Sequence, residues 1–427
     1  MMTTAPQDIF LGEPTWLATP QSSLQINSVA VSPDGQLTVG GSSSEFGTGQ
    51  FCFYGYDATG AEVWRVPVSG PDATQGVFWV AISDDKRFAA CGGETGETAG
   101  FLYIVDATDG RILFQDNQLP SRVNQLTFSH DGNLLLADFE HELRLYQYFE
   151  HELQSCQYTV GCSDLALSAW SQSDSIGLPT DFSSYSGVLA ASGDRVWVGA
   201  INYNTQPYTG LVQQIEVTDG KFGAVATYDQ AQGVMRVVAT ENGVYAAASL
   251  HDGSCAFFQA VQPTTAFVYK PDLASLDIAY AIAITETPAK QLVIVVGANQ
   301  SPIGDKKGDT GVLYRVDVVQ TQSEIANFPV WAPQPGWTHS LLYGVNPGVS
   351  LDRDATLVTA TDGEPDEEGG GINQDESPGN FYLLDARSGQ QLWQYDTRLM
   401  NWPMALTPDG RTAVGGSDDG SIYYWKL

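Results

Sequence analysis

The stretch Ser28-Val-Ala-Val-Ser-Pro-Asp-Gly35 decides the fold, because an apolar strand pattern runs directly into a strong turn signal. Pro33 fixes its own φ angle, Asp34 favours a hydrogen bond to its own backbone, and Gly35 tolerates positive φ. Three further strand patterns follow, separated by polar or glycine-containing turns: Leu37–Gly41, Phe51–Tyr56 and Val63–Val66. Four short strands joined in this way predict an antiparallel meander.

The same pattern recurs to the end of the chain, most clearly in residues 79–114, 381–393 and 404–425. Division of 427 residues among eight units gives about 53 residues each, more than the roughly 40–45 of a compact propeller blade, so long loops must absorb the excess. Seven units are the alternative, because the copies near residues 188 and 236 are the least regular. We place the first strands of eight units near these residues: Ser28, Trp79, Gln125, Val188, Arg236, Ala281, Asn346 and Pro403.

The two ends of the chain complement each other. The last unit has only three strands before Leu427, and the segment 1–25 offers a fourth at Thr15–Thr19, where Trp16 corresponds to Trp64. A strand contributed by the other terminus removes exposed sheet edges. We therefore predict an all-β chain that forms a single closed β-propeller of four-stranded antiparallel blades over residues 1–427, with the N-terminal strand joining the C-terminal blade. Two packed all-β domains are the alternative.

These repeats resemble those of the WD-repeat and quinoprotein-like propellers. The turn Ser32–Gly35 is similar to the turn of bacterial WD-like repeats. The run Asp385-Ala-Arg-Ser-Gly389 followed by Trp393 is similar to the repeat of propellers that bind pyrroloquinoline quinone. The resemblance extends over nearly the whole chain, and it implies a fold rather than a chemistry.

Three segments depart from the repeat. The ten residues Phe139–Tyr148 are followed by a near copy, Phe149–Tyr158, and we expect the two copies to form the third and fourth strands of the third blade. Residues 163–186 are polar and are interpreted as a connector or insertion. Residues 361–380 are interpreted as a long acidic loop.

The charge excludes some partners. The formal net charge is -31, from 50 acidic and 19 basic residues, and such a surface repels nucleic acid and anionic membranes. No apolar segment is long enough to insert into a membrane, and the first residues lack a signal-peptide profile. The five cysteines are irregularly spaced: Cys52, Cys91, Cys156, Cys162 and Cys255. We expect reduced thiols, with all five cysteines on buried or half-buried strands, and a cytoplasmic protein.

A binding site is expected at the mouth of the central channel. In a meander propeller the loops between second and third strands, and between blades, share one face, and here these are the long loops. Long loops on a rigid scaffold are where binding usually occurs. Aromatic residues and arginine are favoured interface anchors, although aromatic residues also fill gaps between blades. The candidate binding residues on that face are Asn27, Trp79, Gln125, Arg236, Tyr280, Asn346 and Trp402, with Phe78 and Asn124 beside them.

Two segments contain residues of the kinds that bind metal ions. The acidic loop offers hard oxygen ligands for Ca²⁺ at Asp362, Glu364, Asp366 and Glu368, but its spacing fails the EF-hand pattern and a solvated loop is the simpler interpretation. The two Glu-His-Glu triplets around His141 and His151 lack the zinc-protease spacing. We therefore expect no cofactor and no metal, with Ca²⁺ as the alternative.

These observations predict a non-catalytic protein-binding or scaffold propeller, and not an enzyme. The sequence contains no nucleophile elbow, phosphate loop or dinucleotide fingerprint. The expected partner is a protein with a basic surface that docks on the long-loop face. The alternatives are a quinoprotein-like oxidoreductase, and a lyase or lactonase with a central divalent metal. The resemblance implies adjacent cysteines and a secretory signal for quinone-binding members, and neither is present.

Overall fold

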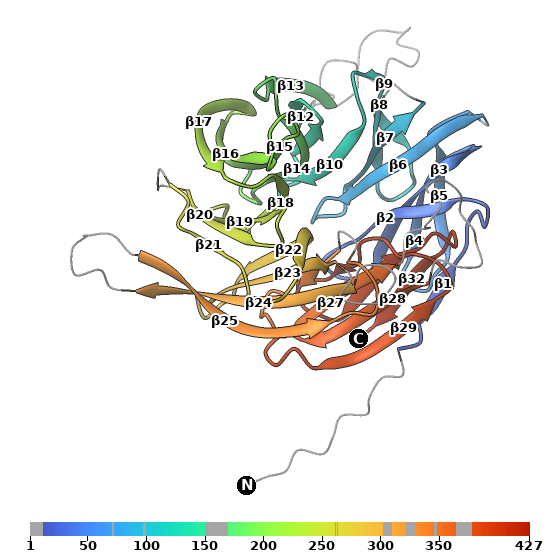
Figure 1. Cartoon of the computed structure of the whole chain (residues 1–427). Helices are drawn as coiled ribbons and strands as arrows, with labels where there is room; N and C mark the ends of the chain where they lie inside the picture. The colour runs from blue at the N-terminus through green and yellow to red at the C-terminus, as the bar shows by residue number, and fades with distance from the viewer. Residues whose placement is uncertain are drawn as a thin grey trace, which may run out of the picture.

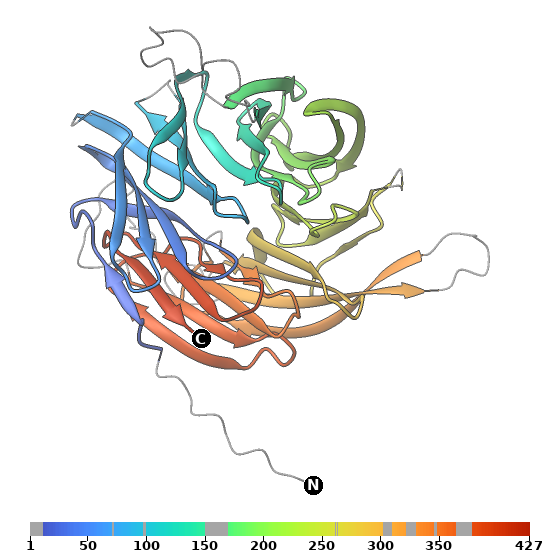
Figure 2. The same ribbon diagram turned by 180° about the vertical axis from the view of Figure 1, so that it is seen from behind.

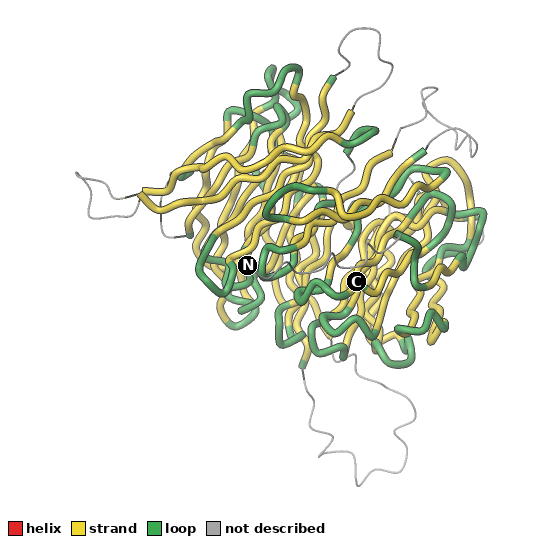
Figure 3. Tube along the Cα trace, turned by 90° about the horizontal axis from the view of Figure 1, so that it is seen from below, coloured by secondary structure: helices red, strands yellow, loops and turns green. Residues whose placement is uncertain are grey.

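The computed structural model describes residues 12–70, 72–96, 100–149, 170–260, 262, 264–301, 310–321, 330–345, 348–363 and 378–427. Their regular structure consists of β-strands connected by turns, and Figure 3 shows no helix among them. No membrane-spanning helix is found in this part of the chain.

The strands form consecutive antiparallel meanders, which we call blades and number in chain order. Blade 1 comprises β2 (Gln25–Val31), β3 (Leu37–Gly49), β4 (Cys52–Asp57) and β5 (Glu62–Pro67). Blade 2 comprises β6 (Ala73–Ile82), β7 (Phe88–Thr95), β8 (Gly100–Asp106) and β9 (Ile112–Leu119). Blade 3 comprises β10 (Val123–Phe128), β11 (Leu134–Phe139), β12 (Glu142–Tyr148) and β13 (Trp170–Gly177). Blade 4 comprises β14 (Ser183–Leu189), β15 (Arg195–Asn202), β16 (Thr209–Thr218) and β17 (Lys221–Gln230).

The second half of the chain repeats this order. Blade 5 comprises β18 (Val234–Ala239), β19 (Tyr245–Leu250), β20 (Cys255–Gln259) and β21 (Phe267–Tyr269). Blade 6 comprises β22 (Leu276–Glu286), β23 (Leu292–Gln300), β24 (Thr310–Thr321) and β25 (Val330–Ser340). Blade 7 comprises β26 (Ser350–Leu351), β27 (Leu357–Gly363), β28 (Gly379–Asp385) and β29 (Gln391–Thr397). Blade 8 comprises β30 (Ala405–Leu406), β31 (Thr412–Gly416), β32 (Ile422–Lys426) and, from the other end, β1 (Trp16–Ala18).

The blades close into a ring, as Figure 1 shows, and their first strands surround its axis, which we call the central channel. The first strands of neighbouring blades contact one another in the order β2, β6, β10, β14, β18, β22, β26 and β30, and β30 contacts β2. The predicted closed β-propeller of four-stranded blades is therefore confirmed, and the described strands form eight blades.

The predicted ring closure is also confirmed. The strand β1 pairs antiparallel with β32, with Trp16 opposite Tyr424, and the two lie side by side in Figures 1 and 2. The backbone N–H of Thr15 donates to the carbonyl of Tyr424 at 2.7 Å. The indole N–H of Trp425 donates to the carbonyl of Gly12, also at 2.7 Å. The chain start thus supplies the fourth strand of blade 8.

One type of turn is repeated around the ring, between the first and second strands. In blade 1 the Ser32 hydroxyl donates to Asp34 and accepts the backbone N–H of Leu37 at 3.0 Å. Gly35 has a φ of 69°, which glycine adopts without steric cost. Thr407, Asp409 and Gly410 form the equivalent turn of blade 8, so the stretch that predicted the fold is a structural unit of it.

The core lies between the blades rather than within them. Each of eight clusters of buried side chains joins one pair of neighbouring blades. Phe53 and Phe101 belong to the cluster between blades 1 and 2. Ile26 and Val414 belong to the cluster between blades 1 and 8. Full burial of one such side chain contributes about 1.5–3 kcal/mol, so the interfaces stabilise a rigid ring.

One loop prediction, for the residues between the second and third strands of blade 1, was wrong. Residues 41–50 were expected to be a loop, but β3 continues to Gly49 and its end pairs with β6 of the next blade, Ser43 opposite Gly76. Blades 1 and 2 therefore share one eight-stranded sheet, and the eight blades form seven hydrogen-bonded sheets. The close approach of the two blades requires glycine at position 76, because a Cβ there would lie 2.7 Å from Phe51 Cγ and 2.8 Å from the Ser42 carbonyl oxygen.

The boundaries in blades 3 and 7 also need correction. Residues 163–186 are not a connector throughout, because Trp170–Gly177 is the fourth strand of blade 3 and Ser183 begins blade 4. The second tandem copy was expected to supply that fourth strand; it lies, except for Phe149, outside the described residues. In blade 7, β27 extends to Gly363 and β28 begins at Gly379, so both ends of the predicted loop 361–380 are strand.

Candidate binding site at the channel mouth

Six consecutive blades carry the same irregularity in their first strand. In each of them the register with the second strand shifts by one residue, which is a β-bulge, and the first strand of blade 6 has a second shift before Ala279. A bulge re-aims side chains, and bulges are common beside functional sites. The extra residues of blades 1 to 6 are Asn27, Phe78, Asn124, Tyr185, Met235 and Tyr280.

Four of these extra residues line a small cavity at the channel mouth. Its volume is about 80 Å³. The bulge in β6 explains why the consecutive residues Phe78 and Trp79 both face this cavity, whereas successive residues of a regular strand point to opposite sides. The lining consists of Asn27, Phe78, Trp79, Arg122, Asn124, Tyr185, Arg236, Trp402 and Pro403.

The structure brings together four of the seven predicted binding residues: Asn27, Trp79, Arg236 and Trp402. Gln125 and Tyr280 are half-buried in first strands but do not line the cavity. Asn346 lies outside the described residues. The site residues that sequence reasoning missed are Arg122, Tyr185 and Pro403.

Two arginines stack on aromatic rings at this mouth. The Arg122 guanidinium carbon lies 3.8 Å from the ring centroid of Phe78, and that of Arg236 lies 4.9 Å from the centroid of Trp79. Arg122 Nε also donates to the Asn124 side-chain oxygen at 2.9 Å. Within the described part of the chain, neither arginine has an ion pair within 4.0 Å. Both guanidinium groups thus lack a direct ion-pair partner there, although Glu94 acts electrostatically on Arg122 and Asp138 on Arg236.

A buried carboxylate stands behind Arg236. Asp138, on β11, is fully buried, and burial raises the pKa of its carboxyl group well above the usual range. Its Oδ2 accepts a hydrogen bond from the Ser184 hydroxyl at 2.9 Å. Burial lowers the pKa of Arg236 to about 10, while the nearby Asp138 acts in the opposite direction. Arg236 remains charged at neutral pH.

Asn27 is an unusual member of the lining. Asn27 is only 3% exposed, yet neither its side-chain nitrogen nor its side-chain oxygen has a hydrogen-bond partner among the described residues. Leaving a buried polar group unsatisfied costs about 1–3 kcal/mol. The amide is therefore available to a group that enters the cavity.

A row of aromatic rings extends from the mouth over blades 4 and 5. The Tyr203 hydroxyl donates to the Tyr185 hydroxyl at 3.2 Å. The rings of Tyr203 and Tyr208 are 5.3 Å apart, and those of Tyr208 and His251 are 4.9 Å apart. Tyr203 is 44% exposed. Tyr185 is part of the first strand β14, whereas Tyr203 and Tyr208 lie in the loop after β15 and His251 in the turn after β19, on the face of the mouth.

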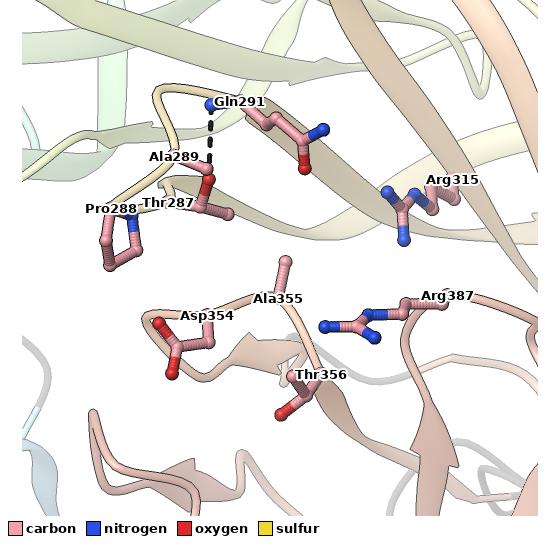
Figure 4. A pocket seen from close by; sticks show the side chains of 9 residues that line it. All are labelled: Thr287, Pro288, Ala289, Gln291, Arg315, Asp354, Ala355, Thr356 and Arg387. Carbon is pink, nitrogen blue, oxygen red and sulfur yellow. Dashed lines mark hydrogen bonds between the residues drawn. The ribbon is translucent and has the colours of Figure 1, made fainter.

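A larger cleft lies on the opposite face, between blades 6 and 7, and Figure 4 shows it. Its volume is about 420 Å³. Arg315 and Arg387 lie near one end and Asp354 near the other, and Arg315 is held by Asp317. The turns between first and second strands form this cleft, with Thr287, Pro288, Ala289, Gln291, Ala355 and Thr356 completing the lining.

The calcium candidates are not supported at Asp362. This residue is fully buried in β27, and burial raises the pKa of its carboxyl group. Its oxygens accept hydrogen bonds from the Tyr343 N–H, from the N–H and side chain of Asn380, and from the Tyr382 hydroxyl. A cation at Asp362 would therefore meet hydrogen-bond donors, which it cannot bind, around the carboxylate. Glu364, Asp366 and Glu368 lie outside the described residues, where the calcium alternative stays a prediction.

The described residues contain no group of three or more His, Cys, Asp or Glu side chains that could hold a metal ion. Of the two histidines in the Glu-His-Glu triplets, His141 shares a hydrogen bond with the Phe182 carbonyl at 2.9 Å. His151 lies outside the described residues.

Eight blades around a lined channel define this chain as a closed β-propeller. No protein-family model matches the sequence, and no curated protein matches it. The fold is similar to the solved β-propeller domain of Cps50 (Swd1) from Myceliophteria thermophila, with a TM-score of 0.52 and 13% sequence identity. The match covers 82% of this chain and 95% of the other. The resemblance is thus confirmed for the fold, and membership of the WD-repeat or quinoprotein-like families stays a prediction.

Proposed function

We propose that this chain is a non-catalytic protein-binding propeller, and that its partner docks on the face that carries the channel mouth. The observation that supports this most directly is the series of β-bulges, which brings aromatic and guanidinium groups together around one cavity. Arg, Trp and Tyr are the residues most enriched among interface hot spots. The rings of Tyr203 and Tyr208 enlarge this surface.

The charge distribution suggests the kind of partner. A net charge of -31 attracts a protein with a basic surface and accelerates the encounter at low salt. It disfavours nucleic acid, whose phosphates would be repelled. The free cysteines Cys52, Cys91 and Cys255 support a reducing compartment such as the cytoplasm.

The test begins with affinity capture from the source cell and identification of the partner, followed by affinity measurements on purified proteins. The double variant Arg236→Ala/Trp402→Ala should weaken binding at least roughly thirtyfold, because a hot-spot truncation costs about 2 kcal/mol. Binding should also weaken as salt rises, because screening removes the attraction of a basic partner.

The matched control lies in the cleft on the opposite face. Asp354→Ala/Arg387→Ala changes one acid and one base there, and it should leave the affinity unchanged. If the control abolishes binding and the mouth variant does not, with both folded, the partner docks on the other face. If no protein binds the purified chain specifically, the proposed function is wrong.

A further inference from the structure

The channel mouth concentrates positive charge in a chain that has little of it. The chain has 19 basic residues against 50 acidic ones, and many of its arginines are paired with carboxylates. Arg144 with Glu142 and Arg353 with Glu241 are examples. Arg122 and Arg236 instead lie on aromatic rings around one cavity, without an ion pair in the described part of the chain.

The geometry around these arginines favours an acceptor group. A guanidinium that lies over an aromatic ring keeps the N–H groups of its edge free for hydrogen bonds in the plane of the group. Charge-assisted hydrogen bonds from arginine to a carboxylate are about twice as strong as neutral ones. The unpartnered Asn27 amide adds a buried donor to the same cavity. The cavity is therefore suited to an anionic group that accepts several hydrogen bonds.

The size of the cavity limits what enters it. A volume of about 80 Å³ is far below the roughly 300–1,000 Å³ of a typical small-molecule site. This accommodates the end of one side chain and not a whole ligand. The half-buried Trp402 and Pro403 supply an apolar wall for a short aliphatic stem.

We propose that the mouth binds the carboxylate of an aspartate or glutamate side chain carried by an extended segment of the protein partner. The carboxylate lies between the guanidinium groups of Arg122 and Arg236 and accepts a hydrogen bond from the Asn27 amide. This inference rests on the proposed function and specifies how the partner is recognised. A carboxylate fits better than a phosphate, because a second negative charge would be repelled more strongly by the surrounding acidic surface.

The electrostatic field of the whole chain also limits which sequences the partner's segment can have. Because the surface is strongly negative, an isolated acidic peptide is repelled at long range. The acidic residue should therefore have basic neighbours, which contact the acidic loops around the mouth. The recognised pattern is one acidic anchor flanked by lysine or arginine.

The experiment is selection of random peptides displayed on phage against the purified full chain. We expect the enriched peptides to share an acidic residue with basic neighbours. Replacing that residue by its amide, Glu by Gln or Asp by Asn, in a synthetic peptide should weaken binding roughly tenfold to hundredfold. Phosphoserine at that position should not improve it.

Variants of the chain locate the site. Arg122→Gln/Arg236→Gln should lose the selected peptides, and Asn27→Asp should weaken them at least tenfold, because the new carboxylate competes for the arginines. The control Arg315→Gln/Arg387→Gln, in the cleft on the opposite face, should retain them. Thermal unfolding of each variant shows that it is folded. Asn27→Asp is nearly isosteric, so it keeps the test decisive if the double variant does not fold.

Several outcomes would overturn the inference. They are the absence of enriched peptides, enrichment without an acidic position, tighter binding of the phosphoserine peptide, and binding lost in the cleft control but kept in the mouth variants. None of these outcomes contradicts the proposed function, which fails only if the whole protein partner is absent or ignores the mouth.

Discussion

The ring of Trp16 stacks on the ring of Tyr424, with centroids 4.9 Å apart and 12° between the two planes. These residues come from opposite ends of the chain, on β1 and β32, which pair in blade 8. The contact therefore covers an edge of the last blade with the first strand. Because each blade of the ring contacts its two neighbours, closure at this point stabilises all the other contacts between blades.

Replacing Trp16 by alanine should destabilise the whole propeller. The ring is half-buried, so we expect a loss of about 2–3 kcal/mol in the free energy of unfolding, near the low end for aromatic truncations. The matched control is Leu17→Ala, on the same strand, where the side chain is 48% exposed. That change should cost less than about 0.5 kcal/mol. Urea unfolding followed by circular dichroism measures both. Equal losses for the two variants would show that Trp16 has no special part in closing the ring.

The three described cysteines should be unreactive in the folded protein. Burial raises the pKa of Cys52, of Cys91 and of Cys255, the last to about 12. Because the thiolate is the reactive form, a chain with Cys156→Ser and Cys162→Ser should show almost no thiol reaction with a disulfide reagent at pH 8. All three thiols should react after denaturation. Fast reaction of any thiol in native buffer would contradict their burial.

Asp362 should stabilise the fold without calcium. Asp362→Ala leaves the donors of Tyr343, Asn380 and Tyr382 unsatisfied in a buried site. We expect a loss of about 3 kcal/mol, equal in the presence of Ca²⁺ and of a chelator. The exposed Asp354→Ala in the same blade is the control. Thermal unfolding in both buffers is the measurement. A loss seen only with Ca²⁺ present would show that Asp362 is a calcium ligand after all.

Local turn chemistry explains why the sequence predicted the ring. In the Ser32–Gly35 turn, the Asp34 carboxylate accepts the backbone N–H of Gln36 at 3.2 Å, which is the local hydrogen bond that the sequence suggested. The strand β1 lies where Trp16 predicted it. The alternation of short strands and turns needs no long-range information. For the same reason, the first strands could be placed to within a few residues.

The site was only partly predictable, because it depends on bulges and on neighbouring blades. Asn27, Trp79, Arg236 and Trp402 follow from their place in or beside the first strands. Arg122 precedes β10 by one residue, and only the packing of its side chain on Phe78, in another blade, brings it to the mouth. The one signal in the sequence that pointed to Arg122 was that basic residues are rare in this chain.

Long polar segments were the least predictable. Trp170–Gly177 is half-exposed and polar apart from Trp170 and Ile176, so its sequence resembles a connector. Its strand identity is determined by pairing with β12 and by the burial of Trp170, which packs against Phe88 of blade 2. Such contacts between blades cannot be inferred from one segment alone.

The buried carboxyl group of Asp138 should make the folding stability depend on pH. Burial raises the pKa of its carboxyl group far above that of an unfolded chain, and Ser184 and Arg236 offset this only partly. Between the two pKa values the folded state holds a proton that the unfolded state has released, so this group makes the folding free energy less favourable as pH rises. Asp138→Asn removes the titrating group and keeps an acceptor for the Ser184 hydroxyl.

We therefore expect Asp138→Asn to be more stable than the wild type at pH 7, with a difference that shrinks as pH falls toward 4.

Asp57 has the opposite effect on the pH dependence of folding stability. Hydrogen bonds from the hydroxyl and amide of Thr59, and from the amide of Ala61, lower the pKa of Asp57. The ionised Asp57 carboxylate therefore stabilises the folded state at neutral pH, and this stabilisation is lost as pH falls through the lowered pKa. Asp57→Asn should thus be slightly less stable than the wild type at pH 7 and equal to it in acid. Urea unfolding from pH 4 to pH 8 measures both. If Asp138→Asn is the less stable protein at pH 7, the attraction between Asp138 and Arg236 outweighs the cost of burying the carboxylate, and the channel wall contains a stabilising ion pair.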